Sequence, residues 1–290
     1  MTYSKNRVLT LLGTKGGPAL RAPGKSFLPT SNLLCLDERK IIVDCGIGVT
    51  QALSRAGYSA SDITDIFITH LHSDHVMELG GLIHTAWVSG LQHQLLVHGP
   101  AGTARVWLRF LKMMEVDIAV RVFDEGRPHL RDLVSVNEYD QGTITQNSDF
   151  TVSALRTIHP PMTECFALSF IADGQKICFS GDTAYFPSLA SFAESARILV
   201  HEAMLESGVE HITAKTLNTD EGLYTHLIAS HSFAHEAGRV ANDAGVELLV
   251  LSHLIPAERN IAGDDDWLGE VRRYFSGNVL VGVDGMQIPF

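Results

Sequence analysis

The hexapeptide His-Leu-His-Ser-Asp-His that begins at His70 places three imidazoles and one carboxylate within six residues. It follows directly on the apolar run Ile63–Thr69, which predicts a strand. Alternate side chains of an extended segment share a face, so His70 and His72 can point the same way. If a helix follows, Asp74 and His75 come round to a second position close by. Neutral imidazole and carboxylate oxygen are good ligands for zinc and similar divalent ions, so this spacing predicts a metal site.

A His-x-His-x-Asp-His motif after a strand resembles the hallmark of the metallo-β-lactamase superfamily. One segment before the hexapeptide and three segments after it are similar to other motifs of that family. These segments are Ile42-Val43-Asp44-Cys45-Gly46, Thr157-Ile158-His159, Ser180-Gly181-Asp182-Thr183 and Leu251-Ser252-His253. The resemblance extends over residues 8 to 285 of the 290-residue chain. It implies an α/β fold, the four-layer αβ/βα sandwich of the family, with the metal site at one edge.

The resemblance also implies two metal sites that share one carboxylate. The ligands would be His70, His72, His159 and Asp182 in the first site, and Asp74, His75, His253 and Asp182 in the second. Asp44 would accept a hydrogen bond from a ligand imidazole and so fix its orientation. Taken alone, His159 would be a loop histidine, His253 a core histidine and Asp182 a turn residue. Only the joint pattern makes them ligands.

A hydrolase with two zinc ions per chain is the activity that the resemblance implies, and manganese or iron would accept the same ligands. A metal-bound hydroxide, formed near neutral pH, would attack an ester-type bond, with Asp74 among the catalytic residues. The alternative is a non-catalytic relative that kept the fold. Such relatives typically lose ligands, whereas every presumptive ligand is present in this chain.

Two later segments narrow the resemblance to the tRNase Z/arylsulfatase-like branch of these hydrolases. They are Val200-His201-Glu202-Ala203-Met204, which is similar to the His-Glu-Ala-Thr motif of that branch, and Ala229-Ser230-His231-Ser232-Phe233, which is similar to its Ala-His-Ser-Thr segment. The resemblance implies that His231, held by Glu202, donates a proton to the leaving oxygen. The alternative is that both residues are polar groups beside a loop.

The chain also departs from tRNase Z. Phe233 stands where that segment has threonine, and no basic Gly/Pro-rich insertion would form the flexible arm with which such enzymes grip tRNA. The net charge of −11 disfavours binding to a phosphate backbone. We therefore expect a small organic substrate with a phosphodiester, sulfate ester, lactone or similar bond, and no nucleic acid partner. Processing of tRNA 3′ ends is the alternative.

The elements that must position these residues fall into two similar halves. Each half predicts a hairpin, a helix and a strand that leads into a histidine. The expected elements are Asn32–Leu36, Lys40–Asp44, Thr50–Ala56 and Ile63–Thr69 in the first half, and Phe166–Ile171, Lys176–Phe179, Leu189–Ser195 and Ile198–Val200 in the second. This repeat indicates two related βα halves within a single domain over residues 1–290.

Other segments are assigned from periodicity and polarity. They predict helices over Thr103–Met114, Phe233–Ala244 and Asp264–Phe275, strands over Val8–Leu12, Leu248–Leu251 and Val279–Val283, a polar, turn-rich stretch over Glu125–Gln146, and a flexible loop or lid within residues 204–228, chiefly Ser207–Thr225. The four cysteines lie in apolar segments, which favours buried thiols in a reducing compartment. We expect a cytoplasmic protein that does not bind membranes. A homodimer is suggested by the family resemblance alone.

Overall fold

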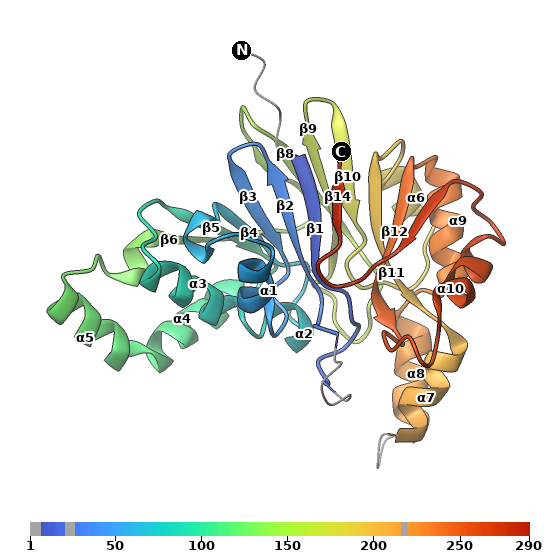
Figure 1. The fold of residues 1–290 in the computed structure, drawn as a ribbon, viewed down its shortest axis with the longest axis horizontal. Coiled ribbons are helices and arrows are strands. Elements are labelled where there is room, and N and C mark those ends of the chain that lie inside the picture. The colour runs from blue at the N-terminus through green and yellow to red at the C-terminus, as the bar shows by residue number, and fades with distance from the viewer. Residues whose placement is uncertain (1–6, 21–26, 216–219) are drawn as a thin grey trace.

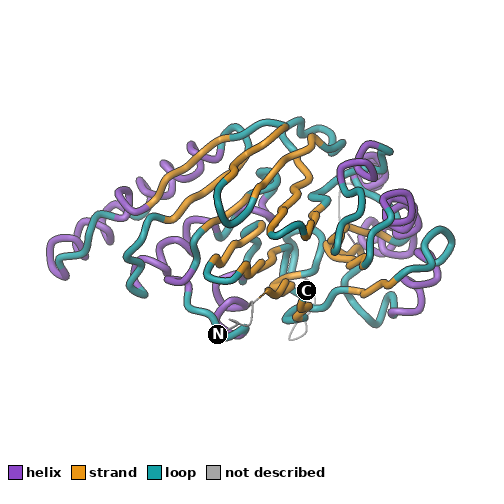
Figure 2. The backbone as a smooth tube through the Cα atoms, turned by 90° about the horizontal axis from the view of Figure 1, so that it is seen from above, coloured by secondary structure: helices purple, strands orange, loops and turns teal. Residues whose placement is uncertain are grey.

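The computed structural model describes residues 7–20, 27–215 and 220–290. Two seven-stranded sheets lie face to face, and helices cover the outer face of each, as the two orthogonal views show (Figures 1 and 2). This is the expected four-layer αβ/βα sandwich. No helix in the described part of the chain is both long and apolar enough to cross a bilayer.

The first sheet has the strand order β14-β1-β2-β3-β4-β5-β6, and the second has the order β13-β12-β11-β10-β9-β8-β7. The strands of the first sheet are β1 (Arg7–Gly13), β2 (Ser31–Leu36), β3 (Arg39–Val43), β4 (Asp65–Phe67), β5 (Leu95–Gly99), β6 (Val134–Glu138) and β14 (Gln287–Pro289). Those of the second are β7 (Gly142–Gln146), β8 (Thr151–Arg156), β9 (Phe166–Ala172), β10 (Gln175–Phe179), β11 (Ile198–Met204), β12 (Leu248–Ile255) and β13 (Asn278–Val281).

The two halves share their pairing pattern, as their sequences predict. The hairpin β2–β3 is followed by the parallel pairs β3–β4 and β4–β5. The hairpin β9–β10 is followed in the same way by the parallel pairs β10–β11 and β11–β12. Parallel neighbours end at the same edge of their sheet, so the loops that follow β4, β10 and β12 can meet at one place.

The helices divide into three groups. On the side of the first sheet lie α1 (Val49–Arg55), α2 (Ser73–Val76), α3 (Leu79–Val88) and α4 (Thr103–Met113), with α5 (Glu115–Glu125) beyond α4 at the end of the molecule. Against the second lie α6 (Ser188–Phe192), α9 (Ala234–Ala244) and α10 (Asp264–Val271). The pair α7 (Glu206–Lys215) and α8 (Asp220–Ser230) projects from the edge of the second half (Figure 1).

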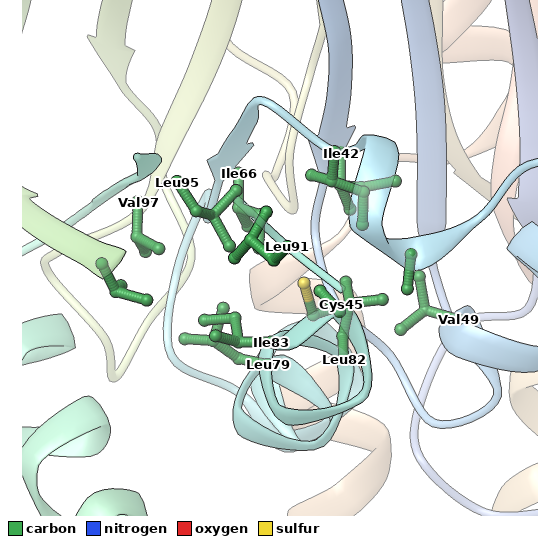
Figure 3. Packing of buried hydrophobic residues seen from close by; sticks show 14 of the residues in the cluster. Ile42, Cys45, Val49, Ile66, Leu79, Leu82, Ile83, Leu91, Leu95 and Val97 are labelled. Carbon is green, nitrogen blue, oxygen red and sulfur yellow. The ribbon is translucent and has the colours of Figure 1, made fainter. Parts of the chain in front are cut away.

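Three apolar layers hold the sandwich together, because the central strands are buried on both faces. In β3, Ile41 faces the layer between the sheets, whereas Ile42 faces the helices of the first half (Figure 3). In β12, Val250 faces the inner layer and Leu249 the helices of the second half. This alternation is the period of two that a strand requires. All four cysteines are buried and free, as expected.

The segment expected to be a flexible loop or lid is instead largely a pair of helices, α7 and α8; residues 216–219 lie outside the described part of the chain. Val209 and Leu227 are buried in a small cluster that also contains Met204 and Ile255. Phe233, which replaces the threonine of the tRNase Z segment, packs against the same cluster. A few apolar residues at helical spacing therefore suffice to dock a segment that is otherwise polar.

The helices α9 and α10 approach each other closely at Gly238, and this contact predicts how substitutions there change stability. A Cβ on Gly238 would lie 2.7 Å from the carbonyl oxygen of Val271, so the two helices would have to separate. On α10 the exposed Gly269 has nothing within 4 Å of such a Cβ. We expect Gly238→Ala to lower the free energy of unfolding by about 1–3 kcal/mol through overpacking. Gly269→Ala should raise it by about 0.5–1 kcal/mol, because alanine is the better helix former.

Urea denaturation of the two variants and the wild type would measure both changes. Equal effects of the two substitutions would contradict the close approach of the helices at Gly238.

Candidate metal centre

The loops at the ends of β4, β8, β10 and β12 bring the predicted metal ligands to one edge of the sandwich. His70 lies between β4 and α2, and α2 begins directly after His72, whose backbone is extended. Asp74 and His75 therefore lie on the first turn of a helix, as their spacing predicts. His159 follows β8, Asp182 follows β10 and His253 lies within β12. Both halves of the fold contribute ligands.

The first ligand group consists of His70, His72, His159 and Asp182, whose donor atoms all lie within 4.8 Å of one another. His72 Nδ1 is 3.1 Å from His70 Nε2 and 2.9 Å from His159 Nε2. Asp182 Oδ2 lies 3.6 Å from His70 Nε2. Three imidazole nitrogens and one carboxylate oxygen that face a common point form the donor set of a four-coordinate zinc ion.

The second group consists of Asp74, His75, His253 and again Asp182. His253 Nε2 lies 3.3 Å from Asp74 Oδ2 and 3.2 Å from Asp182 Oδ2. His75 Nε2 lies 3.3 Å from Asp182 Oδ1, the other oxygen of the shared carboxylate. Asp182 thus presents oxygens to both groups, which is the geometry of a carboxylate that bridges two cations.

Neighbouring groups fix the imidazole tautomers so that lone pairs face the centre. His75 Nδ1 donates to Asp44 Oδ2 at 2.8 Å, and His159 Nδ1 donates to the carbonyl oxygen of Ser230 at 2.8 Å. The Nε2 atoms of both rings are then free to act as ligands. Burial lowers the pKa of His70 well below its usual range and that of His159 to about 4, which keeps these rings neutral.

Three buried atoms of the cluster, His75 Nε2, Asp182 Oδ1 and His253 Nδ1, have no hydrogen-bond partner among the described residues. Buried polar atoms are normally paired, and an orphan at a functional site calls for an ion or a water. The first two are a nitrogen and an oxygen that lie 3.3 Å apart. The residues therefore fit divalent cations at both groups, and their identification as ligands is our proposal.

The glycine-rich turn before the first long loop helps to position this centre. Gly17 N donates to Asp74 Oδ2 at 2.8 Å, which orients that carboxylate toward the second group. A Cβ on Gly16 would lie 2.9 Å from His253 Nδ1 and 2.6 Å from Ile255 Cγ1, so only glycine fits there. The second glycine-rich turn, His98–Thr103, is not part of the cavity lining and instead begins α4.

The predicted acid pair lies beside the second group. His231 Nδ1 is 2.9 Å from Glu202 Oε2, and Glu202 Oε1 accepts a hydrogen bond from Thr183 N at 2.5 Å. The His231 ring stacks on His253 with ring centroids 5.4 Å apart. Burial raises the pKa of Glu202 and lowers that of His231, which favours a net-neutral pair with one proton between the carboxylate and Nδ1. A second proton is then left on Nε2.

A cavity of about 510 Å³ opens above the ligands. One wall carries His72, Asp74, Asp182, His231 and His253. The other is mainly apolar and contains Ile212, Leu223, Leu227, Ile255, Pro256 and Ile261. The helix pair α7–α8 supplies part of this apolar wall, so the segment expected to be a lid does border the site.

Sequence reasoning assigns no role to five further histidines, and the structure separates them: they are His84, His93, His211, His226 and His235. His211 and His226 line the cavity, whereas His84 is not among its lining residues and its Nε2 lies 2.8 Å from Asp117 Oδ2. Ser230 Oγ donates to the carbonyl oxygen of Pro160 at 2.7 Å, so it accepts from His226 Nδ1 at 3.3 Å. The other ring nitrogen of His226 is then left for a bound substrate. The four-residue spacing of His226 and Ser230 on a helix was the available sequence signal.

Comparison with known proteins agrees with this geometry. The family model described as "Anti-Pycsar protein Apyc1" matches residues 8–250. Ribonuclease Z of Mycobacterium bovis is 32% identical over 279 residues, which is 95% of each chain. The metallo-β-lactamase fold protein YhfI of Bacillus subtilis superposes with a TM-score of 0.70 at 23% identity, covering 98% of this chain and 99% of its own. The short form of human tRNase Z gives 0.68 at 21% identity, with 97% and 98% covered.

The chain therefore belongs to the metallo-β-lactamase superfamily and, within it, to the anti-Pycsar protein Apyc1 family. Its relatives and its fold make it a metal-dependent hydrolase. The names of the ribonuclease Z relatives also weigh against our expectation that nucleic acid is not a partner.

Sharing of Asp182 predicts unequal effects of two carboxylate substitutions. Because Asp74 belongs to the second group alone, Asp74→Ala should leave about one zinc ion per chain. Asp182→Ala removes a ligand from both groups and should leave well below one. Elemental analysis after dialysis against zinc-free buffer would measure the content, with His84→Ala as a control that keeps the wild-type amount. Equal losses in the two aspartate variants would show that Asp182 is not shared.

Proposed function

We propose that this protein is a phosphodiester hydrolase of the ribonuclease Z type, which cleaves RNA at the 3′ end of a precursor tRNA. The observation that carries the proposal is the buried Glu202–His231 pair, which lies directly beside the second ligand group. The ribonuclease Z relatives, similar over 95% of the chain, support RNA as the substrate. We further propose zinc as the metal, because the donor set combines imidazole nitrogens with carboxylate oxygens.

The residues of the site divide the work of hydrolysis. Two zinc ions held by the ligand groups would lower the pKa of a water molecule and offset negative charge that develops on the phosphate. Asp182 and Asp74 supply the carboxylate oxygens of the second group, and the Gly17 amide fixes Asp74. His231 Nε2 is left to protonate the leaving oxygen, while Glu202 holds the ring through Nδ1.

The acidic net charge does not decide against RNA. Bound divalent ions are the largest local charges in a site, and they would make the floor of the cavity positive. The histidines His72, His211 and His226 around the cavity add no negative charge. A phosphodiester can therefore bind locally even though the protein as a whole carries a charge of −11.

The cavity favours a second candidate, the small organic ester that we expected from the sequence. A cavity of about 510 Å³ with one apolar wall suits a compact aromatic or aliphatic group beside the reacting centre. The two candidate functions use the same chemistry at the metal centre and differ in the part of the substrate that binds beyond it. An assay of which substrate is hydrolysed distinguishes them.

Two substrates with different leaving groups can show whether His231 acts as a general acid or has only a structural role. Removing a general acid typically costs a factor of about 10²–10⁴ where the leaving oxygen needs a proton. We expect the zinc-loaded protein to cleave precursor tRNA and bis(4-nitrophenyl) phosphate. His231→Ala should slow RNA cleavage by at least ~10²-fold, but should change release of nitrophenolate, a stable anion, by less than ~10-fold. His93→Ala, an exposed histidine outside the cavity, is the matched control.

Single-turnover assays with and without a chelator would give the rates. Turnover of the nitrophenyl diester without cleavage of precursor tRNA would favour the small-substrate candidate. No metal-dependent hydrolysis of either compound would refute the proposed function, and equal losses on both substrates would refute the role of His231.

A further inference from the structure

One face of α8 carries a single imidazole among apolar side chains where the helix borders the cavity. Leu223, His226, Leu227 and Ser230 follow the i, i+3, i+4, i+7 spacing that places residues on one side of a helix. The first three line the cavity above the ligand groups. Leu227 is also buried in the apolar cluster that docks α8 on the rest of the protein. The His226 ring is therefore presented to the cavity by a docked helix face.

The hydrogen bonds of Ser230 fix the tautomer of His226. Ser230 is buried, and its hydroxyl donates its one proton to the carbonyl oxygen of Pro160 at 2.7 Å. Ser230 Oγ can then only accept, and His226 Nδ1 lies 3.3 Å from it. With its proton on Nδ1, the neutral ring carries its lone pair on Nε2. Burial and the nearby His231 ring lower the pKa of His226, so the ring is neutral at neutral pH.

His226 lies close both to a ligand of the first group and to the proton donor. Its ring centroid is 6.1 Å from that of His159 and 6.2 Å from that of His231. The rings of His159 and His231 are themselves 4.9 Å apart. A group bound at His226 Nε2 would thus be a neighbour of the oxygen that receives a proton from His231. A neutral nitrogen with a lone pair fits a hydroxyl group there, whereas a phosphate oxygen also only accepts.

We propose that His226 accepts a hydrogen bond from the ribose 2′-hydroxyl beside the scissile phosphate and so selects RNA over DNA. This role rests on the proposed function, cleavage of the ribonuclease Z type. Hydrolysis that leaves a 3′-hydroxyl breaks the bond between phosphorus and O3′. Water supplies the new oxygen on phosphorus and releases a proton to solvent, while O3′ takes the proton of His231 Nε2. The 2′-hydroxyl is carried by the adjacent ribose carbon, and it is the group by which proteins distinguish RNA from DNA.

The apolar neighbours of His226 make this contact selective. Leu223 and Leu227 flank the ring on α8 and line the same cavity, so they exclude water from the hydrogen bond when a nucleotide is bound. A deoxyribose would leave Nε2 unpaired in these surroundings. A site that is built to bind a substrate hydroxyl rejects the analogue without it, because its own polar group then loses its partner.

Two precursor tRNAs that differ in one oxygen atom test this role with the full-length, zinc-loaded protein. One is entirely RNA, and the other has a 2′-deoxynucleotide on the 5′ side of the scissile phosphate. In single-turnover assays the wild type should cleave the deoxy precursor at least ~3-fold more slowly, as expected for the loss of one hydrogen bond. This comparison requires no substitution in the protein, so a folding defect cannot cause the difference.

Substitutions at His226 show whether the difference comes from this ring or from the effect of the 2′-oxygen on the leaving O3′. His226→Ala should lower the ratio of the RNA rate to the deoxy rate by about 3–10-fold relative to wild type. His226→Gln, whose side-chain oxygen can accept the same hydrogen bond, should retain part of the ratio. His211→Ala is the matched control, because His211 lines the same cavity from α7, and it should keep the wild-type ratio.

Thermal unfolding would check that the three variants remain folded. An unchanged ratio in His226→Ala would overturn the proposal and leave the proposed function intact, and so would an equal loss of the ratio in His211→Ala. An equal slowing of His226→Ala on both precursors and on bis(4-nitrophenyl) phosphate would also overturn it, because the ring would then act on the phosphate. No cleavage of either precursor by the wild type would refute the proposed function and this role together.

Discussion

The candidate metal centre at the edge of the sandwich depends on the electrostatic environment of one buried carboxylate, Asp182. Five ligand imidazoles and Asp74 surround it within the same small volume. Burial opposes ionisation of Asp182, but the adjacent His253 and His75 rings hold its pKa well below the usual range. A charged group that is buried without full compensation is costly. Divalent cations between these donors would supply the missing charge, so the free energy of metal binding also stabilises this part of the fold.

The sandwich is what brings these donors together. Each half ends its parallel strands at the same edge, and the two inner faces pack through a common apolar layer. Ligands separated by up to 183 positions, His70 and His253, therefore reach one centre. The groups that orient them come from other loops: Asp44 after β3 holds His75, and Gly17 after β1 holds Asp74, both of which lie on α2. Because the ligands come from loops of both sheets, their relative positions depend on the strand register in each sheet.

Local pattern was sufficient to predict the parts of the site that are contiguous. Strand-to-helix geometry alone places His70, His72, Asp74 and His75, because their spacing matches both periodicities. Asp182 and His253 could be assigned only through the family resemblance, since nothing local distinguishes a ligand from a turn or core residue. The two hairpins and the helices α1, α4, α6, α9 and α10 were predicted, because buried strands and amphipathic helices leave clear patterns, whereas α3 and α5 were not predicted.

The features that could not be predicted from the sequence depend on tertiary contacts. The α7–α8 pair reads as polar because only a few residues, such as Val209 and Leu227, dock it. His226 gains its place beside the cavity from that docking. The apolar residues of α5 have the spacing of an ordinary core-facing helix, and only the fold reveals that Val116, Val120 and Phe123 are exposed. In each case the missing information is which face of a helix the rest of the chain covers.

Anomalous X-ray scattering at the zinc absorption edge, from crystals of the zinc-loaded protein, tests the central claim most directly. The shared carboxylate predicts two anomalous peaks about 3.5–4 Å apart, one on each side of Asp182. The first should lie among His70, His72 and His159, and the second among Asp74, His75 and His253. A single peak, or two peaks that do not both contact Asp182, would contradict the account.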